Sequence, residues 1–328
     1  MNLPCRPRRN RANSTIRSLV SETTVGVTDL VQPLFLLEDP NARESIDSLP
    51  GIERLGLEPM KRHCETLQRS GIGGVALFPV FPSSVKDAQG SVALDADNYF
   101  YKALEALKDT FPDLVFFVDV ALDPYTDHGH DGLLDAGGNI DNDLTVERLC
   151  AISVLLAQTG VDYVAPSDMM DGRIAAIRGE LDSQNYQTTG IMAYSAKFAS
   201  ACYGPFRDAV GSAQSKGYLD KMSYQLNPSN GREASRELAL DENEAADIVM
   251  VKPAGWYADI IYRGRSLVSV PIAAYQVSGE YSMILASADR GWIDRDSAVS
   301  ESLTAIKRAG ADLIFSYFAL EFASKRGK

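Results

Sequence analysis

The chain has 328 residues, of which 45% are hydrophobic and 23% are charged, which is enough apolar material for a sizeable core. Its net charge of −12 argues against nucleic acid or an anionic membrane as the principal partner. No apolar run approaches the roughly 18 residues that span a bilayer, and the first residues lack the apolar centre of a secretion signal, so we expect a cytoplasmic protein. The four cysteines are scattered and form no CxxC pair, so we interpret them as reduced thiols.

The first 25 residues are unusually basic, while the rest of the chain carries the acidic excess. The arginines of this segment are Arg6, Arg8, Arg9, Arg11 and Arg17. A solvated tail is the simplest interpretation. The alternative is an arm that lies on the acidic surface of a neighbouring subunit.

From residue 26 to residue 328, short apolar runs alternate with longer stretches of helical pattern, which is typical of β/α units with buried parallel strands. The runs are 30–37, 72–80, 114–122, 163–167, 190–197, 247–253, 271–279 and 311–319. Gly71, Gly160 and Gly310 each precede one of these runs or open it, as expected where glycine ends a helix. Eight units predict a (β/α)8 TIM barrel. A doubly wound open sheet is the alternative, but no GxGxxG follows the first strand.

In such a barrel the chemistry lies at the carboxyl ends of the strands. Polar residues stand there in this sequence, namely the aspartates of the third run, Ser167 and Asp168, Lys197, Lys252, Ser278, and Ser316 with Tyr317. Lys197 and Lys252 end two consecutive strands. A buried lysine is costly when charged, and a second ammonium nearby lowers its pKa further, which leaves a nucleophilic amine. This pair predicts Schiff-base chemistry on a ketone or an aldehyde, with snorkelling to the surface as the simpler interpretation of either lysine alone.

The long segment from Phe198 to Ala246 separates these two strands. Its glycines 204, 211 and 217 and the donors Arg207, Lys221 and Gln225 predict a lid that closes over an anionic substrate. An ordinary helix–loop–helix connection fits the composition equally well. The two lysines and the cationic lid together indicate keto acids as substrates.

The stretch DVALDPYTDHGHDG, residues 119–132, holds four aspartates and two of the three histidines of the chain. His128 and His130 suggest a metallohydrolase, because His-X-His with a carboxylate can hold a metal. The only other histidine, His63, lies in a predicted helix before the second run and cannot be expected to complete the site. We therefore interpret both histidines as structural.

Several long motifs resemble the porphobilinogen synthase family, also called 5-aminolevulinate dehydratase, and the resemblance covers essentially the whole chain. They are HGHDG (128–132), SDMMDGR (167–173), YSAKFASACYGPFRDA (194–209), IVMVKP (248–253) and YQVSGEY (275–281). The resemblance implies a lyase of tetrapyrrole and heme biosynthesis that condenses two 5-aminolevulinate molecules to porphobilinogen with loss of two waters. It also implies a TIM barrel whose N-terminal arm, residues 1–25, wraps a neighbour in a homo-octamer.

By the same resemblance, Lys252 forms the Schiff base with one substrate, on the P side, and Lys197 with the other, on the A side. Ser278 and Tyr317 hold the P-side carboxylate, and Arg207, Lys221 and Gln225 hold the A-side carboxylate. Tyr275, Phe206, Ser167 and Asp119 match pocket-lining positions, where ordinary packing remains an equal interpretation.

Zinc-using members of the family carry three cysteines at the positions that are Ala121, Asp123 and Asp131 here. Alanine cannot bind a metal, and carboxylates suit Mg²⁺ or water rather than zinc. The chain thus resembles the aspartate-bearing group without catalytic zinc, and Asp123 and Asp131 are predicted to orient the A-side substrate. Glu233 matches a glutamate that binds an allosteric, activating Mg²⁺ through water molecules.

Two other functions remain open at this point. A class I aldolase acting on another keto acid needs one essential lysine and has no use for Lys221 or Tyr317. A non-catalytic, homo-oligomeric barrel protein would need neither lysine.

Overall fold

The computed structural model describes residues 3–212 and 220–326. Eight parallel strands form a closed barrel: β1 (Leu30–Leu36), β4 (Gly74–Pro79), β5 (Val115–Val120), β6 (Tyr163–Pro166), β7 (Gly190–Lys197), β8 (Ile248–Lys252), β9 (Ile272–Gln276) and β10 (Leu313–Ser316). Each strand pairs with the next, and β10 returns to pair with β1, where Leu30 aligns with Ile314. This closure confirms the predicted TIM barrel and excludes the open sheet. All eight strands lie within or coincide with the predicted runs.

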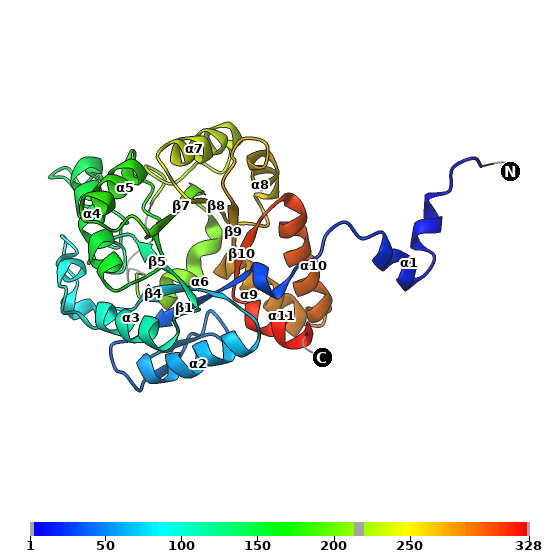
Figure 1. Ribbon diagram of the computed structural model, residues 1–328, viewed down its shortest axis with the longest axis horizontal. Coiled ribbons are helices and arrows are strands. Elements are labelled where there is room, and N and C mark those ends of the chain that lie inside the picture. Colours follow the sequence, from blue (N-terminus) through cyan, green and yellow to red (C-terminus); the bar gives the residue numbers. More distant parts are fainter. Residues whose placement is uncertain (1–2, 213–219, 327–328) are drawn as a thin grey trace.

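Helices surround the barrel, as Figure 1 shows in a view near its axis. They are α2 (Leu57–Arg69), α3 (Tyr99–Thr110), α4 (Asn142–Gln158), α5 (Arg173–Ser183), α7 (Gly231–Asn243), α8 (Ala258–Gly264), α9 (Ser278–Asp289), α10 (Arg295–Ala309) and α11 (Ala319–Arg326). Side chains of Asn98, Asp141 and Asp294 cap the starts of α3, α4 and α10 by accepting backbone N–H groups. Gly71, Gly160 and Gly310 follow helix ends with positive φ, as predicted.

The inside of the barrel is filled with apolar side chains rather than open. Phe117 of β5 and Phe315 of β10 approach each other with ring centroids 5.3 Å apart. Every residue of β1, β4 and β8 is buried, because helices cover the outside and packed side chains fill the inside. Functional groups are therefore confined to the carboxyl ends of the strands.

A small antiparallel hairpin, β2 (Arg43–Ser45) and β3 (Glu53–Leu55), was not predicted from the sequence. β3 extends the sheet at the carboxyl end of β1, where Phe35 aligns with Arg54. All three residues of β2 are exposed, so the hairpin has no apolar run that would reveal it. It lies at the end of the barrel that carries the polar strand ends.

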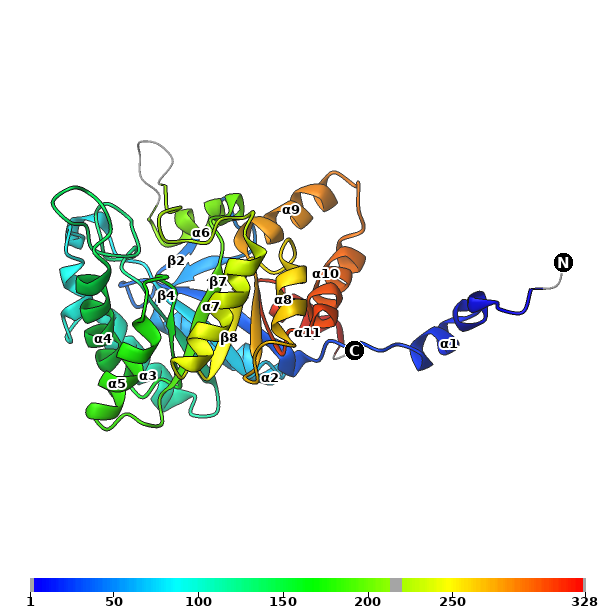
Figure 2. The same ribbon diagram turned by 90° about the horizontal axis from the view of Figure 1, so that it is seen from above.

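The predicted lid is shorter than the segment from Phe198 to Ala246. Its last part is α7, which packs on β7 and β8 as an ordinary crossover helix. The part at the barrel mouth consists of η5 (Ala201–Tyr203) and α6 (Gly204–Ala209), which Figure 2 shows at the same end as the start of α9. Gly217 lies outside the described residues. A closing motion of this segment stays a prediction.

The N-terminal segment extends away from the barrel in both ribbon views (Figures 1 and 2). It contains η1 (Pro7–Arg11) and α1 (Ser14–Leu19), and neither has a buried residue. Val25 is buried and joins the core. Within the described ranges, no helix combines the length and apolarity that crossing a membrane requires.

The contact between α9 and η5 generates the first testable prediction. A Cβ added at Gly279 would lie 2.6 Å from the carbonyl oxygen of Cys202 and 2.8 Å from its Cα, so alanine there must push η5 away from α9. We expect Gly279→Ala to lower the free energy of unfolding by about 1–3 kcal/mol, measured by urea denaturation. Gly73→Ala is the control, because its Cβ would meet nothing within 4 Å. Equal midpoints for the two variants would contradict this account of the packing.

Candidate active site

The pairing of β7 with β8 places Lys197 beside Lys252. Ala193 aligns with Val249, but the register then shifts by one residue, so that Ala196 aligns with Val251 and Lys197 with Lys252. A regular ladder would have put Ala196 opposite Lys252. Residues in register on neighbouring strands project to the same side, so the shift brings both ammonium groups to one cavity.

Lys252 lies in a box of aromatic rings. Its Nζ is 4.7 Å from the ring centroid of Tyr275, 4.9 Å from Phe206, 5.0 Å from Tyr194 and 5.2 Å from Tyr203. Burial of the amine, reinforced by the charge of Lys197, lowers its pKa to about 7. A large share of Lys252 is therefore a neutral, nucleophilic amine near neutral pH, as the sequence predicted.

Lys197 behaves differently, although it is equally buried. Its Nζ donates to Oδ2 of Asp131 at 2.9 Å and to the carbonyl oxygen of Ser167. Burial lowers the pKa of Lys197, but the attraction of Asp131, Asp123 and Asp119 outweighs it and raises the pKa. Lys252 is therefore the partly neutral amine of the pair, and Lys197 is the neighbouring ammonium that helps to lower its pKa.

Asp131 is the carboxylate that the other residues predicted for the A-side substrate contact. It accepts hydrogen bonds from Nζ of Lys221 and, at 3.4 Å, from Nε2 of Gln225 in addition to that from Lys197. Burial opposes ionisation of this carboxyl, yet the two ammonium groups hold its pKa far below the usual range. Asp123 lies 3.7 Å from the Nζ of Lys221. The predicted residues of this side are therefore brought together by their charges.

Asp119, at the end of β5, is a carboxyl group of a different kind. Burial, reinforced by the charge of Asp123, raises its pKa to about 7 in spite of Lys197, Lys252 and a hydrogen bond from Ser167. Near neutral pH it is partly protonated, so it can donate or accept a proton beside the amine of Lys252.

The residues predicted to hold the P-side carboxylate, Ser278 and Tyr317, are buried beside residues of the ring box. The hydroxyls of Tyr275 and Tyr317 are 3.2 Å apart. Ser278, the first residue of α9, accepts a hydrogen bond from the backbone N–H of Phe206 at 3.0 Å. Ser278 is thus the contact between α9 and α6 over the amine.

One small cavity joins the two lysines and the A-side residues, whereas Ser278, Tyr275 and Tyr317 do not line it. It is lined by Asp119, Asp123, Asp131, Ser167, Lys197, Tyr203, Phe206, Arg207, Lys221, Gln225 and Lys252. Its volume of about 30 Å³ is close to the share of liquid volume of one water molecule. The side chains are therefore closed over the amines, and substrates can enter only when some of them move.

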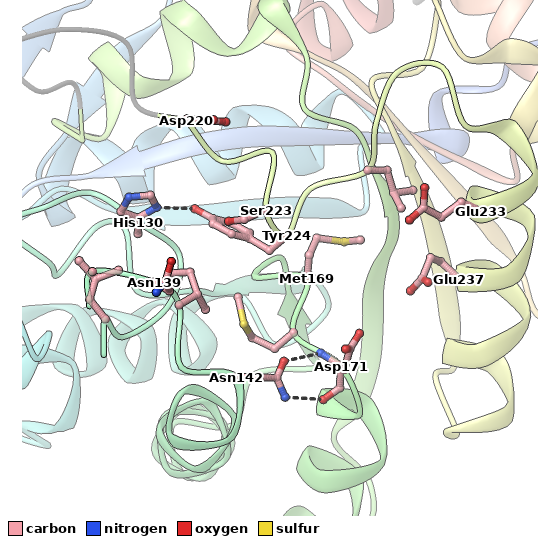
Figure 3. Close-up of a pocket in the computed structure, with 15 residues that line it drawn as sticks. His130, Asn139, Asn142, Met169, Asp171, Asp220, Ser223, Tyr224, Glu233 and Glu237 are labelled. Carbon is pink, nitrogen blue, oxygen red and sulfur yellow. Dashed lines mark hydrogen bonds between the residues drawn. The ribbon is translucent and has the colours of Figure 1, made fainter. Parts of the chain in front are cut away.

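A larger, acidic cavity of about 520 Å³ lies beside this site (Figure 3). Glu233 and Glu237, one turn apart on α7, face it together with Asp171 and Asp220. Burial raises the pKa of Glu237, and Asp241 adds to the shift. Glu233 is exposed and accepts a hydrogen bond from Asn230. The predicted metal position thus lines a cavity with several carboxylates, although Glu233 itself shares no contact with the lysines.

The two histidines of the stretch 119–132 make structural contacts. The Nδ1 of His130 is 3.1 Å from the hydroxyl of Tyr224, and the Nε2 of His128 is 3.3 Å from the carbonyl oxygen of Ala88. No group of three or more His, Cys, Asp and Glu side chains within residues 3–212 and 220–326 is arranged to hold a metal ion. Nothing in this arrangement favours the metallohydrolase alternative.

The sequence did not reveal several residues around the site. Tyr194 and Tyr203 complete the ring box. Tyr194 stands three residues before Lys197, a spacing that would put the two on opposite sides of a regular strand, and the register shift brings them to the same side. Arg173 lies within SDMMDGR, but the sequence did not indicate its role. Its side chain is fully buried and pairs with Asp241 of α7 at 3.1 Å and with Asp168 at 3.6 Å. This network ties the end of β6 to α7 and holds Asp168 away from the cavity.

The barrel mouth holds a partly neutral lysine, a second lysine and space for a carbonyl group. These features define an enzyme site for amine catalysis on a ketone or an aldehyde.

The family model described as "Delta-aminolevulinic acid dehydratase" matches residues 4–325. The chain therefore belongs to the delta-aminolevulinic acid dehydratase family and is an enzyme of the lyase class. This confirms the resemblance predicted from the sequence, while membership of the zinc-independent group stays a prediction.

Relatives of the same name cover nearly the whole chain. The enzyme of Chlamydia pneumoniae is 49% identical over 97% of this chain and 95% of its own length, and that of Bradyrhizobium diazoefficiens is 49% identical over 99% and 92%. A crystal structure of the Toxoplasma gondii enzyme, in complex with its reaction product porphobilinogen, superposes with a TM-score of 0.95 at 44% identity and covers 98% of this chain and 92% of that one.

The contrast between the lysines can be measured by reductive methylation with formaldehyde at a series of pH values, followed by mass analysis of peptides. We expect the modification of Lys252 to rise through a midpoint near 7, because only the neutral amine reacts. Lys197→Met removes a cation that lowers the pKa of Lys252, so the midpoint should move to higher pH. The exposed Lys102 reports the pH dependence of the reagent. A Lys252 profile that follows Lys102 would contradict the low pKa.

Proposed function

We propose that this chain condenses two 5-aminolevulinate molecules to porphobilinogen with loss of two waters, in the tetrapyrrole and heme pathway of the cytoplasm. Family membership supports the reaction. The observation that carries the chemistry is the in-register pair of buried lysines, of which one is partly neutral near pH 7. The cavity offers two lysine amines, one for the ketone group of each of the two substrates.

Lys252 forms the first covalent bond, because it alone of the two is a partly neutral amine. Its Nζ attacks the ketone carbon of the P-side substrate to give a carbinolamine. Asp119, whose pKa is about 7, donates a proton to the departing hydroxyl, which leaves as water as the C=N bond forms. The four surrounding rings exclude bulk water and so protect the imine from hydrolysis.

Lys197 acts on the A-side substrate after it loses a proton. Its pKa is raised chiefly by Asp131, so any change that weakens the Lys197–Asp131 pair releases the amine. The carboxylate of the second substrate competes with Asp131 for Lys221 and Gln225, with Arg207 as a further donor. Asp123 and Asp131, which lie beside these donors, are proposed to orient that substrate.

The P-side carboxylate is held by the hydroxyls of Ser278 and Tyr317. Both are buried, and Tyr317 is hydrogen-bonded to Tyr275, which forms a wall of the ring box. A buried hydroxyl that already has a fixed partner loses little freedom when it donates to a carboxylate. Phe206 and Ser167 complete the walls on the side of α6 and β6.

No zinc takes part in this proposal. Asp123 and Asp131 are engaged by lysines, and the third corresponding position is Ala121, so the donor set does not fit zinc. The acidic cavity fits Mg²⁺, which prefers one or two carboxylates and retained waters. Glu233 would hold the ion there, and Glu237 lines the same wall and is an equally placed ligand. The bound ion would neutralise the carboxylates and activate the enzyme allosterically.

The N-terminal arm is proposed to wrap a neighbouring subunit in a homo-octamer. Its helices bury nothing within their own chain, and Leu19 is 80% exposed. An apolar side chain of this exposure beside five arginines is suited to an acidic partner surface with an apolar patch.

The reaction and the order of the lysines can be tested together. Borohydride reduction with a low concentration of 5-aminolevulinate should trap an adduct on Lys252 before one appears on Lys197. Lys252→Ala should lower kcat for porphobilinogen by about 10³-fold or more and abolish the first adduct. Absence of product from the wild type would refute the proposed function. An adduct that appears first on Lys197 would refute the order. An essential role for one lysine only would favour an aldolase.

The metal proposal predicts that a zinc-selective chelator leaves activity intact and that Mg²⁺ raises it. Glu233→Gln or Glu237→Gln should weaken Mg²⁺ binding by about tenfold or more, measured by titration calorimetry. The exposed Glu301→Gln is the control. Loss of activity with the chelator that zinc restores, or Mg²⁺ binding that neither cavity variant weakens, would count against the proposal.

A further inference from the structure

Helix α6 carries two of the side chains that close the site, although it has only six residues and few contacts of its own. The ring of Phe206 lies 4.9 Å from the Nζ of Lys252, and Arg207 lines the cavity. A helix this short is marginal by itself, since its terminal carbonyl groups have no partners within the helix. Something outside α6 must fix its position.

Two cationic side chains from distant parts of the chain donate to carbonyl groups at its carboxyl end and just beyond it. Arg54 of β3 donates from Nη2 to the carbonyl oxygen of Asp208 and from Nε to that of Ala209, both at 2.7 Å. Lys86, in the loop after β4, donates from Nζ to the carbonyl oxygen of Gly211 at 3.0 Å. Cations are favoured at the carboxyl end of a helix, and the fork of arginine suits two neighbouring carbonyls.

The hairpin that carries Arg54 is itself fixed to the barrel. β3 pairs with the end of β1, and Ser48, between β2 and β3, donates to Oδ2 of Asp208 at 2.6 Å. At the other end of α6, the N–H of Phe206 donates to Ser278. The helix is thus held at its start by α9 and at its end by the β2–β3 hairpin and the loop after β4.

We propose that Arg54 and Lys86 are positioning residues that hold α6 over the barrel mouth and thereby place Arg207 for the carboxylate of the second substrate. Neither lines the cavity, so neither contacts the reacting atoms. The assignment of the substrate rests on the proposed function, but the fixing of α6 does not. Without these contacts the end of α6 is free to move, and Arg207 loses its fixed place in the wall of the cavity that Lys221 and Gln225 also line.

Kinetics of Arg54→Ala, Arg54→Lys and Lys86→Met test the role in substrate binding. We expect Arg54→Ala to raise the KM for 5-aminolevulinate by about 10- to 100-fold while kcat changes by less than about threefold, because uniform binding is lost and the chemistry at Lys252 is retained. Arg54→Lys should recover part of the loss, since it keeps one donor. Lys86→Met keeps the stem and should raise the KM by a smaller factor.

Arg43→Ala is the matched control, because Arg43 stands on the same hairpin but pairs with Glu53 and not with α6. We expect its kinetics to equal those of the wild type. An equal effect of Arg43→Ala and Arg54→Ala would show that stability of the hairpin is responsible and would overturn the proposal. So would a loss of kcat without a change in KM.

Hydrogen exchange gives a readout that does not depend on activity. The amides of Val210, Gly211 and Ser212 donate to Phe206, Asp208 and Arg207, and they should exchange at least about tenfold faster in Arg54→Ala, whereas amides of β1 should not change. Unchanged exchange would refute the fixing of α6. Absence of porphobilinogen from the wild-type reaction would refute the proposed function. Hydrogen exchange would still show whether Arg54 fixes the end of α6.

Discussion

The site depends on how three lysines and three aspartates share one buried cavity. Asp131 takes the charges of Lys197 and Lys221, so it stays ionised at the bottom of the mouth. Lys252 has four aromatic rings around its amine and no carboxylate hydrogen-bonded to it among the described contacts, so burial keeps the amine partly neutral. An aspartate in place of one ring would raise the pKa of that amine and remove the nucleophile. The difference between the two lysines is thus made by their neighbours and not by depth, because both are almost completely buried.

Parts of the chain that are far apart in sequence maintain this difference. The ring box takes residues from β7, β9 and the segment of η5 and α6, and the carboxylates come from β5 and the loop after it. Gly279 lets α9 approach η5 closely, and Arg54 fixes the other end of α6. Each contact is modest alone. Together these contacts fix the position of the six-residue helix α6 relative to the barrel.

The barrel could be predicted from the sequence because its strands are buried on both sides and read as continuous apolar runs. The polar residues at the strand ends could be predicted for the same reason, since Lys197 and Lys252 stand out where apolar runs end. The β2–β3 hairpin could not be predicted, because each strand has three residues and only Leu55 among them is apolar. The raised pKa of Lys197 was missed because Asp131 lies 66 residues earlier in the chain, and only the fold brings them within 2.9 Å. Arg173 and Arg54 look like ordinary charged residues until their buried or distant partners are known.

The shift of register in β7 decides which residue stands beside Lys252. A barrel with one reactive lysine needs only a single polar residue at one strand end, and a regular ladder through the present β7 would offer Ala196 as its neighbour. Because the irregularity between Ala193 and Ala196 takes up one residue, Lys197 stands there instead. The local geometry of one strand thus decides whether the cavity holds one amine or two.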